Sequence, residues 1–106
     1  MEVNFVLPAS VVSGSTFHVA VVVKHAPLGA LVNINLDQVG TSLAPPAMWH
    51  GAPASAPALA PPGAPDGTAS ATFTVTLAGT GRASLQATAD LPTGDLSVRV
   101  DHVDVV

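Results

Sequence analysis

The chain has 106 residues, enough for one domain (1–106) built on a single core. Apolar residues make up 48% of it and charged residues only 9%, and seven acids against three cations give a formal net charge of -4. Three cations cannot follow a phosphate backbone, so nucleic acid is not an expected partner. No cysteine is present, so neither a disulfide nor a thiolate metal site can form within the chain.

The scarcity of charge has two explanations. A surface with few charges is expected where part of it faces another protein. A composition rich in Ala, Pro, Gly and Val, as a GC-rich genome encodes, explains the scarcity equally well. No basic and apolar leader precedes the first strand, and no run of about 18 apolar residues occurs, so neither export nor membrane insertion is expected.

Blocks of alternating apolar and polar residues, separated by turn residues, predict β-strands along the chain. Prolines, glycines and β-branched residues interrupt every stretch long enough for a helix, so an all-β fold is expected. The side chains expected to point inward are Val3, Phe5 and Leu7; Phe17, Val19, Val21 and Val23; Val32, Ile34 and Leu36; Ala71, Phe73, Val75 and Leu77; and Ala83, Leu85, Ala87 and Ala89. The first strand is expected to break at Pro8 and to continue over residues 11–15.

The last block, residues 95–105, contains two apolar series in opposite phases. We expect Leu96, Val98 and Val100 to point inward, and a bulge near Asp101 to shift the phase so that the apolar pair Val103 and Val105 also points inward.

Residues 38–67 form a long connection with most of the chain's ten prolines and its only tryptophan. Connections of this length in a small domain are usually functional or disordered. Proline-rich segments cannot pair as central strands, so only a short edge strand over residues 47–51 is expected here.

These blocks predict an immunoglobulin-like, two-sheet antiparallel sandwich of about seven strands, interrupted by the Pro/Ala-rich connection. The runs LPASVVSGSTFHVAVVVK and DGTASATFTVTLAGTGRASLQATA resemble the bacterial immunoglobulin-like (Big-type) domains of surface proteins and tailed-phage virion proteins. Val11, Gly14 and Phe17 match the family's spacing into its second strand, and residues 67–73 match its entry into the fifth. The sequence departs at Gly81–Arg82, where relatives often place an aromatic residue.

Catalysis is not expected. A nucleophile needs a base within hydrogen-bond reach and the base needs an orienting partner, yet His18, His25, His50 and His102 belong to no such motif. The chain is therefore predicted not to be an enzyme and to have no catalytic residue and no cofactor.

A metal site is not expected either. Asp101, His102 and Asp104 are potential ligands close together in sequence, with Asp90 and Asp95 as further candidates. Neighbouring side chains of a strand point to opposite faces, so these groups cannot converge on one ion.

Polar residues on several predicted strands would gather on one sheet face if those strands are neighbours. They are Asn33, Asn35, Gln86, Thr88, Ser97 and Arg99. A sugar-binding site usually also contains an aromatic side chain that stacks on the sugar ring, and this face has none. A hydrated polar surface is therefore the preferred interpretation, and glycan contact is the weaker one.

Met48, Trp49 and His50 are the candidate partner-binding residues. An aromatic residue and a methionine in a Pro/Ala-rich loop either fold back over the core or are offered to a partner. The sequence leaves both readings open.

The resemblance and the missing catalytic motifs imply a non-catalytic structural or binding module. The expected role is a bacteriophage virion accessory protein, such as a capsid decoration (cement) protein, made in the host cytoplasm and bound to capsid or other virion subunits, or to sister copies in a homo-oligomer. The alternative is a domain excised from a bacterial cell-surface protein, acting as a spacer or weak glycan-binding adhesin. The start at Met1 favours the first reading.

Overall fold

A computed structural model describes residues 1–41, 43–45, 48–59, 63 and 66–106. These ranges contain eight strands: β1 (Glu2–Val6), β2 (Ser10–Val11), β3 (Thr16–Ala26), β4 (Leu31–Thr41), β5 (Ala54–Pro57), β6 (Gly67–Thr76), β7 (Gly81–Asp90) and β8 (Leu96–Val105). Within them, no helix has the length and apolar character needed to cross a membrane. The expected all-β fold is confirmed.

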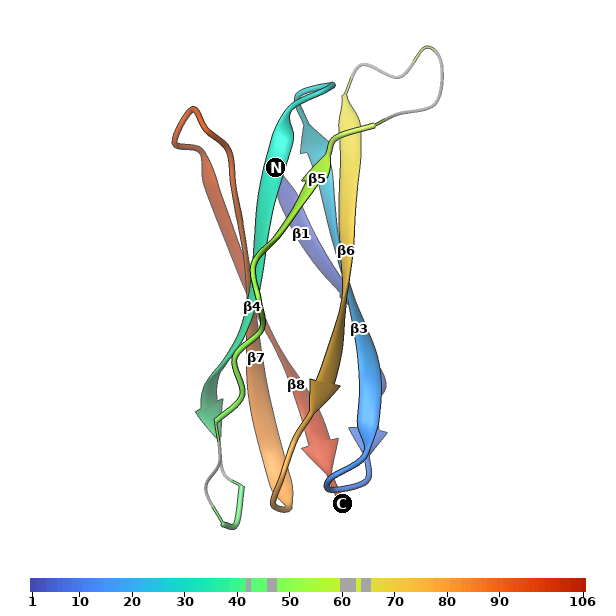
Figure 1. Cartoon of the computed structure of the whole chain (residues 1–106), viewed down its shortest axis with the longest axis vertical. Coiled ribbons are helices and arrows are strands. Elements are labelled where there is room, and N and C mark those ends of the chain that lie inside the picture. Colours follow the sequence, from blue (N-terminus) through green and yellow to red (C-terminus); the bar gives the residue numbers. More distant parts are fainter. Residues whose placement is uncertain (42, 46–47, 60–62, 64–65) are drawn as a thin grey trace.

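The strands form two sheets that face each other in an elongated body of 47 × 24 × 17 Å (Figure 1). The smaller sheet has the order β1-β3-β6, and the larger sheet has the order β2-β8-β7-β4-β5. Neighbours are antiparallel except β2, which lies parallel to β8. The first segment changes sheets at Pro8, because β1 pairs with β3 whereas β2 pairs with β8. The expected break in the first strand is therefore confirmed, but the strand continues as β2 at Ser10–Val11 and not over residues 11–15.

The core lies between the two sheets and is made mainly of aliphatic side chains. Val19, Val21 and Val23 of β3 are fully buried opposite the larger sheet. That sheet contributes Val32, Ile34 and Leu36 from β4 and Ala83, Leu85, Ala87 and Ala89 from β7. Burying one Val or Leu side chain contributes about 1.5–3 kcal/mol, so the long strands β3, β4, β6 and β7, with the C-terminal half of β8, contribute most of the burial energy.

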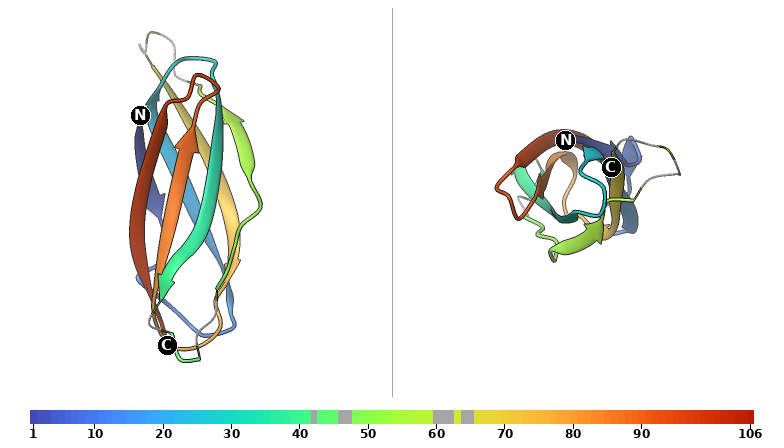
Figure 2. Two further views of the ribbon diagram at one scale, coloured as in Figure 1. Left: turned by 90° about the vertical axis from the view of Figure 1, so that its left-hand side faces the viewer. Right: turned by 90° about the horizontal axis from the view of Figure 1, so that it is seen from above.

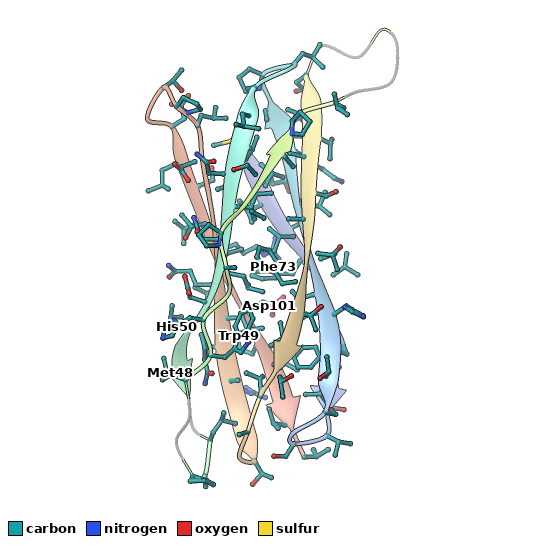
Figure 3. The ribbon with its side chains drawn as sticks, viewed as in Figure 1. Met48, Trp49, His50, Phe73 and Asp101 are labelled. Carbon is teal, nitrogen blue, oxygen red and sulfur yellow. The ribbon has the colours of Figure 1, made fainter. Side chains whose placement is uncertain are left out.

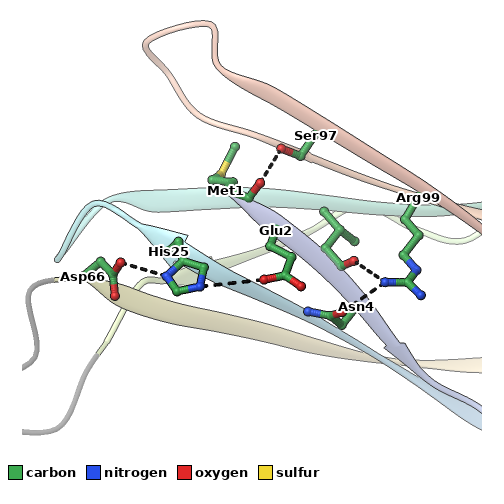
Figure 4. A network of polar contacts seen from close by, with 8 residues as sticks. Met1, Glu2, Asn4, His25, Asp66, Ser97 and Arg99 are labelled. Atoms are coloured by element: carbon green, nitrogen blue, oxygen red, sulfur yellow. Dashed lines mark hydrogen bonds and ion pairs between the residues drawn. The ribbon is translucent and has the colours of Figure 1, made fainter.

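Strand β3 ends in a bulge, where its pairing with β6 is regular up to Val23 and shifts before Ala26. His25 lies in this bulge with a φ of 60°, a left-handed conformation that costs about 1–2 kcal/mol. Its Nδ1 lies 2.9 Å from Asp66 Oδ2 and its Nε2 lies 3.7 Å from Glu2 Oε2 (Figure 4). These contacts join the beginning of β1, the end of β3 and the residue before β6.

The expected phase of β8 is wrong. Its pairing with β7 runs without a shift from Asp90↔Leu96 to Gly81↔Val105, so no bulge occurs near Asp101. Val103 and Val105 are buried, and an uninterrupted alternation from them turns Leu96, Val98 and Val100 to the outside. A regular ladder allows only one phase, and the buried valines near the C-terminus set it.

The inward positions of the first half of β8 carry polar side chains instead. The Ser97 hydroxyl donates a hydrogen bond to the Met1 carbonyl oxygen at 3.2 Å. Arg99 Nη1 donates to Asn4 Oδ1 at 3.1 Å and to the Val3 carbonyl oxygen at 3.5 Å (Figure 4). Because this half of β8 lies beside β1 at the edge of the sandwich, polar groups here find partners on β1.

The proline-rich connection is shorter than expected, because residues 38–41 belong to β4 and Gly67 begins β6. The edge strand is β5, at Ala54–Pro57, and not residues 47–51. Of the expected range, His50 forms a single bridge with Asp37, and Ala47 lies outside the described residues.

Candidate interaction face

The larger sheet has one side that points away from the core. We call this side, as formed by β8, β7, β4 and β5, the outer face. Figure 2 shows it toward the viewer, with no other element across β8, β7 and β4. In the part of the chain that the structure describes, it contains one apolar series. Leu96, Val98 and Val100 follow one another along β8 and are 61%, 51% and 46% exposed. We call these three residues the β8 stripe.

Beside the stripe, the outward positions of β7 and of the middle of β4 are polar, whereas Leu31 and Val39 of β4 are 50% and 47% exposed. Four residues expected to cluster do so, because Asn33 and Asn35 of β4 lie beside Gln86 and Thr88 of β7. The other two, Ser97 and Arg99, lie on the opposite side of β8 and contact β1. The predicted cluster of six polar residues on one face is therefore wrong, and a glycan contact that needs all six residues loses its basis.

Two pairs of titratable side chains lie near the margins of the outer face. Arg82 Nε lies 3.1 Å from Asp104 Oδ1. His50 Nδ1 lies 3.2 Å from Asp37 Oδ1. Both pairs are exposed to solvent, where an ion pair contributes at most about 1 kcal/mol. The Arg82–Asp104 pair lowers the net charge that the outer face presents.

The segment with Met48, Trp49 and His50 is fixed to β4 at the edge of this face. The backbone N–H of Gln38 donates to the Trp49 carbonyl oxygen at 2.9 Å, and the Trp49 N–H donates to Gln38 Oε1 at 2.9 Å. Gln38 is buried, so its side chain acts as an internal clamp.

The three residues of this segment point in different directions (Figure 3). Trp49 is partly buried and packs against the hydrophobic core. Met48 is 55% exposed, and His50 is exposed beside Asp37. Each of the two interpretations, folding back over the core and exposure to a partner, therefore applies in part. Trp49 covers the core, whereas Met48 and His50 are exposed at the surface.

Potential catalytic groups do not assemble in the described part of the chain. Ser84 Oγ lies 2.9 Å from His102 Nδ1 on the outer face. Asp101 points away from this pair and accepts the backbone N–H of His102 at 2.8 Å. The nearest acid along the same face, Asp104, is paired with Arg82. A nucleophile–base pair is thus present without an orienting acid.

Potential metal ligands do not converge either. The described residues contain no group of three or more His, Cys, Asp or Glu side chains placed to hold an ion. Ser, Ala and Pro make up the residues outside the described ranges, so every His, Asp and Glu of the chain is included in that statement.

Comparison with solved structures shows where this fold occurs. Three structures of superoxide reductase (neelaredoxin) from Ignicoccus hospitalis, two of them variants, match over 98–99% of this chain and 79% of theirs. The TM-scores are 0.61, 0.60 and 0.59 and the sequence identities 18%, 19% and 18%. No protein-family model and no curated protein matches the chain. At such identity the matches show a shared fold.

These matches contradict the expected role as a bacteriophage virion or capsid decoration protein, and equally its alternative as a surface spacer or adhesin. That expectation rested on likeness to the sandwiches of virion and surface proteins. The solved structures named above, which share the fold, are redox enzymes instead.

The residues of this chain do not fit a protein-held redox centre. One-electron chemistry on oxygen species needs a redox-active group, commonly a metal ion. The chain has no thiol, and its histidines lie apart: on the outer side of β3, in the β3 bulge, beside Asp37, and beside Ser84. The fold is shared, whereas the described residues of this chain bring no set of metal ligands together.

Proposed function

We propose that this chain is a self-associating β-sandwich domain that acts through its outer face and carries no catalytic centre of its own. The β8 stripe is the observation that supports this proposal most. Its three side chains are contiguous and about half exposed, and no described segment lies over them. Apolar residues scattered singly on a surface are normal, whereas a contiguous series marks a contact surface.

The composition supports the same proposal. Only 9% of the residues are charged, and the charged pairs of the outer face are satisfied within the chain. Burying this face against protein would therefore remove few unpaired charges from water, which keeps the desolvation cost low.

The candidate partner-binding residues extend the outer face at its β4 edge. His50 pairs with Asp37, whose side chain lies on the outer face, and Met48 precedes it on the same segment. Because Trp49 and Gln38 fix the backbone, Met48 and His50 are presented with little loss of conformational entropy on binding. We include both in the proposed contact surface.

The immunoglobulin-like relation belongs to the proposal as well. In that fold the first, second and fifth of seven strands lie in one sheet and the third, sixth and seventh lie in the other, as β1, β3 and β6 and then β4, β7 and β8 do here. The orders β1-β3-β6 and β2-β8-β7-β4-β5 support this description.

Sedimentation velocity over a range of protein concentrations tests the proposal. We expect the unmodified chain to associate reversibly and Val98→Lys to weaken association on the order of tenfold or more, because a charge would be buried at the centre of the stripe. Val12→Lys is the matched control, since Val12 is 63% exposed and lies beside the C-terminal end of β8, away from the β8 stripe. Equal association of both variants would contradict the proposal.

A further inference from the structure

We infer that the partner on the outer face is a second copy of this chain, packed face to face with antiparallel strands about a two-fold axis beside Val98. The inference rests on the proposed self-association and specifies its geometry. It follows from the way in which apolar, amide and carboxylate groups are distributed over neighbouring strands.

Strand pairing sets these groups out in rows across the outer face. Each row contains one residue from each of β8, β7 and β4. The first row is Leu96, Asp90 and Asn33; the second is Val98, Thr88 and Asn35; and the third is Val100, Gln86 and Asp37. The second row lies at the centre of the β8 stripe.

An antiparallel two-fold arrangement centred on the second row buries the whole stripe. Such an axis lies between the two sheets and perpendicular to the strands, so β8 faces β8 and the row order is reversed. Val98 then faces the partner's Val98, and Leu96 faces the partner's Val100. All three exposed apolar side chains lose water together.

The same arrangement places each carboxylate of the three rows opposite an amide. Asp90 faces the partner's Gln86, and Asp37 faces the partner's Asn33. The amide NH₂ groups can donate to the carboxylates. No two acids of these rows meet across the axis.

Two other two-fold arrangements bring like charges together. An axis that runs parallel to β8 and directly over it places Asp104 over the partner's Asp104. An antiparallel arrangement centred on Val100 places Asp37 over the partner's Asp37. Like charges across an interface are costly, so the arrangement centred on Val98 is favoured.

The shared face is small, as in a weak and reversible dimer. With Val98 at the centre, the two copies overlap over the three rows, which span five residues or about 17 Å along the strands, and β8, β7 and β4 cover about 14 Å. The product, about 240 Å² per copy, is below the roughly 800 Å² per partner of a standard interface, so association is expected at high protein concentration.

Cysteine cross-linking tests the geometry, because the chain has no cysteine of its own. Single variants Leu96→Cys, Val98→Cys and Val100→Cys are treated with a bis-maleimide that spans about 10 Å, the separation of two packed sheets. Val12→Cys, which is exposed beside the C-terminal end of β8 and away from the β8 stripe, is the control for random collision. All four positions are exposed, so folding is not at risk.

We expect Val98→Cys to form cross-linked dimers by itself. Leu96→Cys alone and Val100→Cys alone should not cross-link, because the two copies of the same residue are offset by about 13 Å along the strands. A mixture of the two variants should cross-link, because Leu96 faces the partner's Val100. Self-cross-linking of both Leu96→Cys and Val100→Cys would show parallel packing and overturn the inference.

The outcomes also separate this inference from the proposed function. A dimer in sedimentation with no cross-link from any β8 position, or with equal cross-linking of Val12→Cys, overturns the geometry and leaves self-association standing. A chain that sediments as a monomer at every concentration overturns both.

Discussion

Gly51 lies where the connection passes closest to β4 and to its own tryptophan. A Cβ atom at this position would be 2.7 Å from the Leu36 carbonyl oxygen and 2.8 Å from Trp49 Cη2. Its N–H also donates to that carbonyl at 3.0 Å. The absence of a side chain therefore lets the segment approach β4 while the indole ring stays against the core.

Gly51→Ala should lower the free energy of unfolding by about 1–3 kcal/mol, because backbone and ring must both move to admit the methyl group. The measurement is urea denaturation followed by Trp49 fluorescence. Gly40→Ala is the matched control, since a Cβ there would lie 4.0 Å from Ser84 Cβ, an ordinary contact distance. Equal stability of the two variants would show that the close approach is not tight.

At the scale of elements, β8 differs from the other long strands because its two halves have different roles. Its C-terminal half supplies Val103 and Val105 to the core. Its N-terminal half contacts β1 through Ser97 and Arg99 and presents the β8 stripe to the outside. One regular strand thus helps to close the sandwich and forms the proposed contact surface.

A pair of identical substitutions on β8 tests this division. Val103 is 1% exposed and Val100 is 46% exposed. Val103→Ala should destabilise the fold by about 2 kcal/mol, because it leaves a cavity. Val100→Ala should cost less than about 0.5 kcal/mol, as is usual for exposed sites. Denaturation at concentrations low enough to keep the chain monomeric distinguishes these values, and a reversed order would mean that β8 has the opposite phase.

The sequence predicted β3, β4, β6 and β7 well because each carries one unbroken alternation, whose inward set matches the buried residues. It failed on β8, where Leu96, Val98 and Val100 alternate in one phase and Val103 and Val105 in the other. Local pattern cannot choose between two apolar phases, whereas pairing with β7 can. The β8 stripe was therefore assigned to the core and missed as a surface.

The position of the edge strand of the larger sheet could not be predicted from the sequence either. Strand β5 consists of Ala, Ser and Pro, which favour no regular structure. The clamp between Gln38 and Trp49 joins residues whose contact depends on the path of the connection. Met48 and His50 could be named from composition, but their place beside the outer face required the fold.

At the scale of the whole molecule, the chain shares a fold with superoxide reductases while its ligand-type side chains lie scattered over the surface. A sandwich of this kind can serve different functions, because function depends on the groups displayed and not on the scaffold. Here the β8 stripe displays three consecutive outward apolar side chains, and the low charge of the chain favours burying it.

Light scattering of the unmodified chain over a dilution series tests self-association most directly. We expect the weight-average mass to rise from that of one chain toward that of two as concentration increases. The Val98→Lys variant should keep the mass of one chain over the same range. A mass of one chain for the unmodified protein at every concentration would contradict the account.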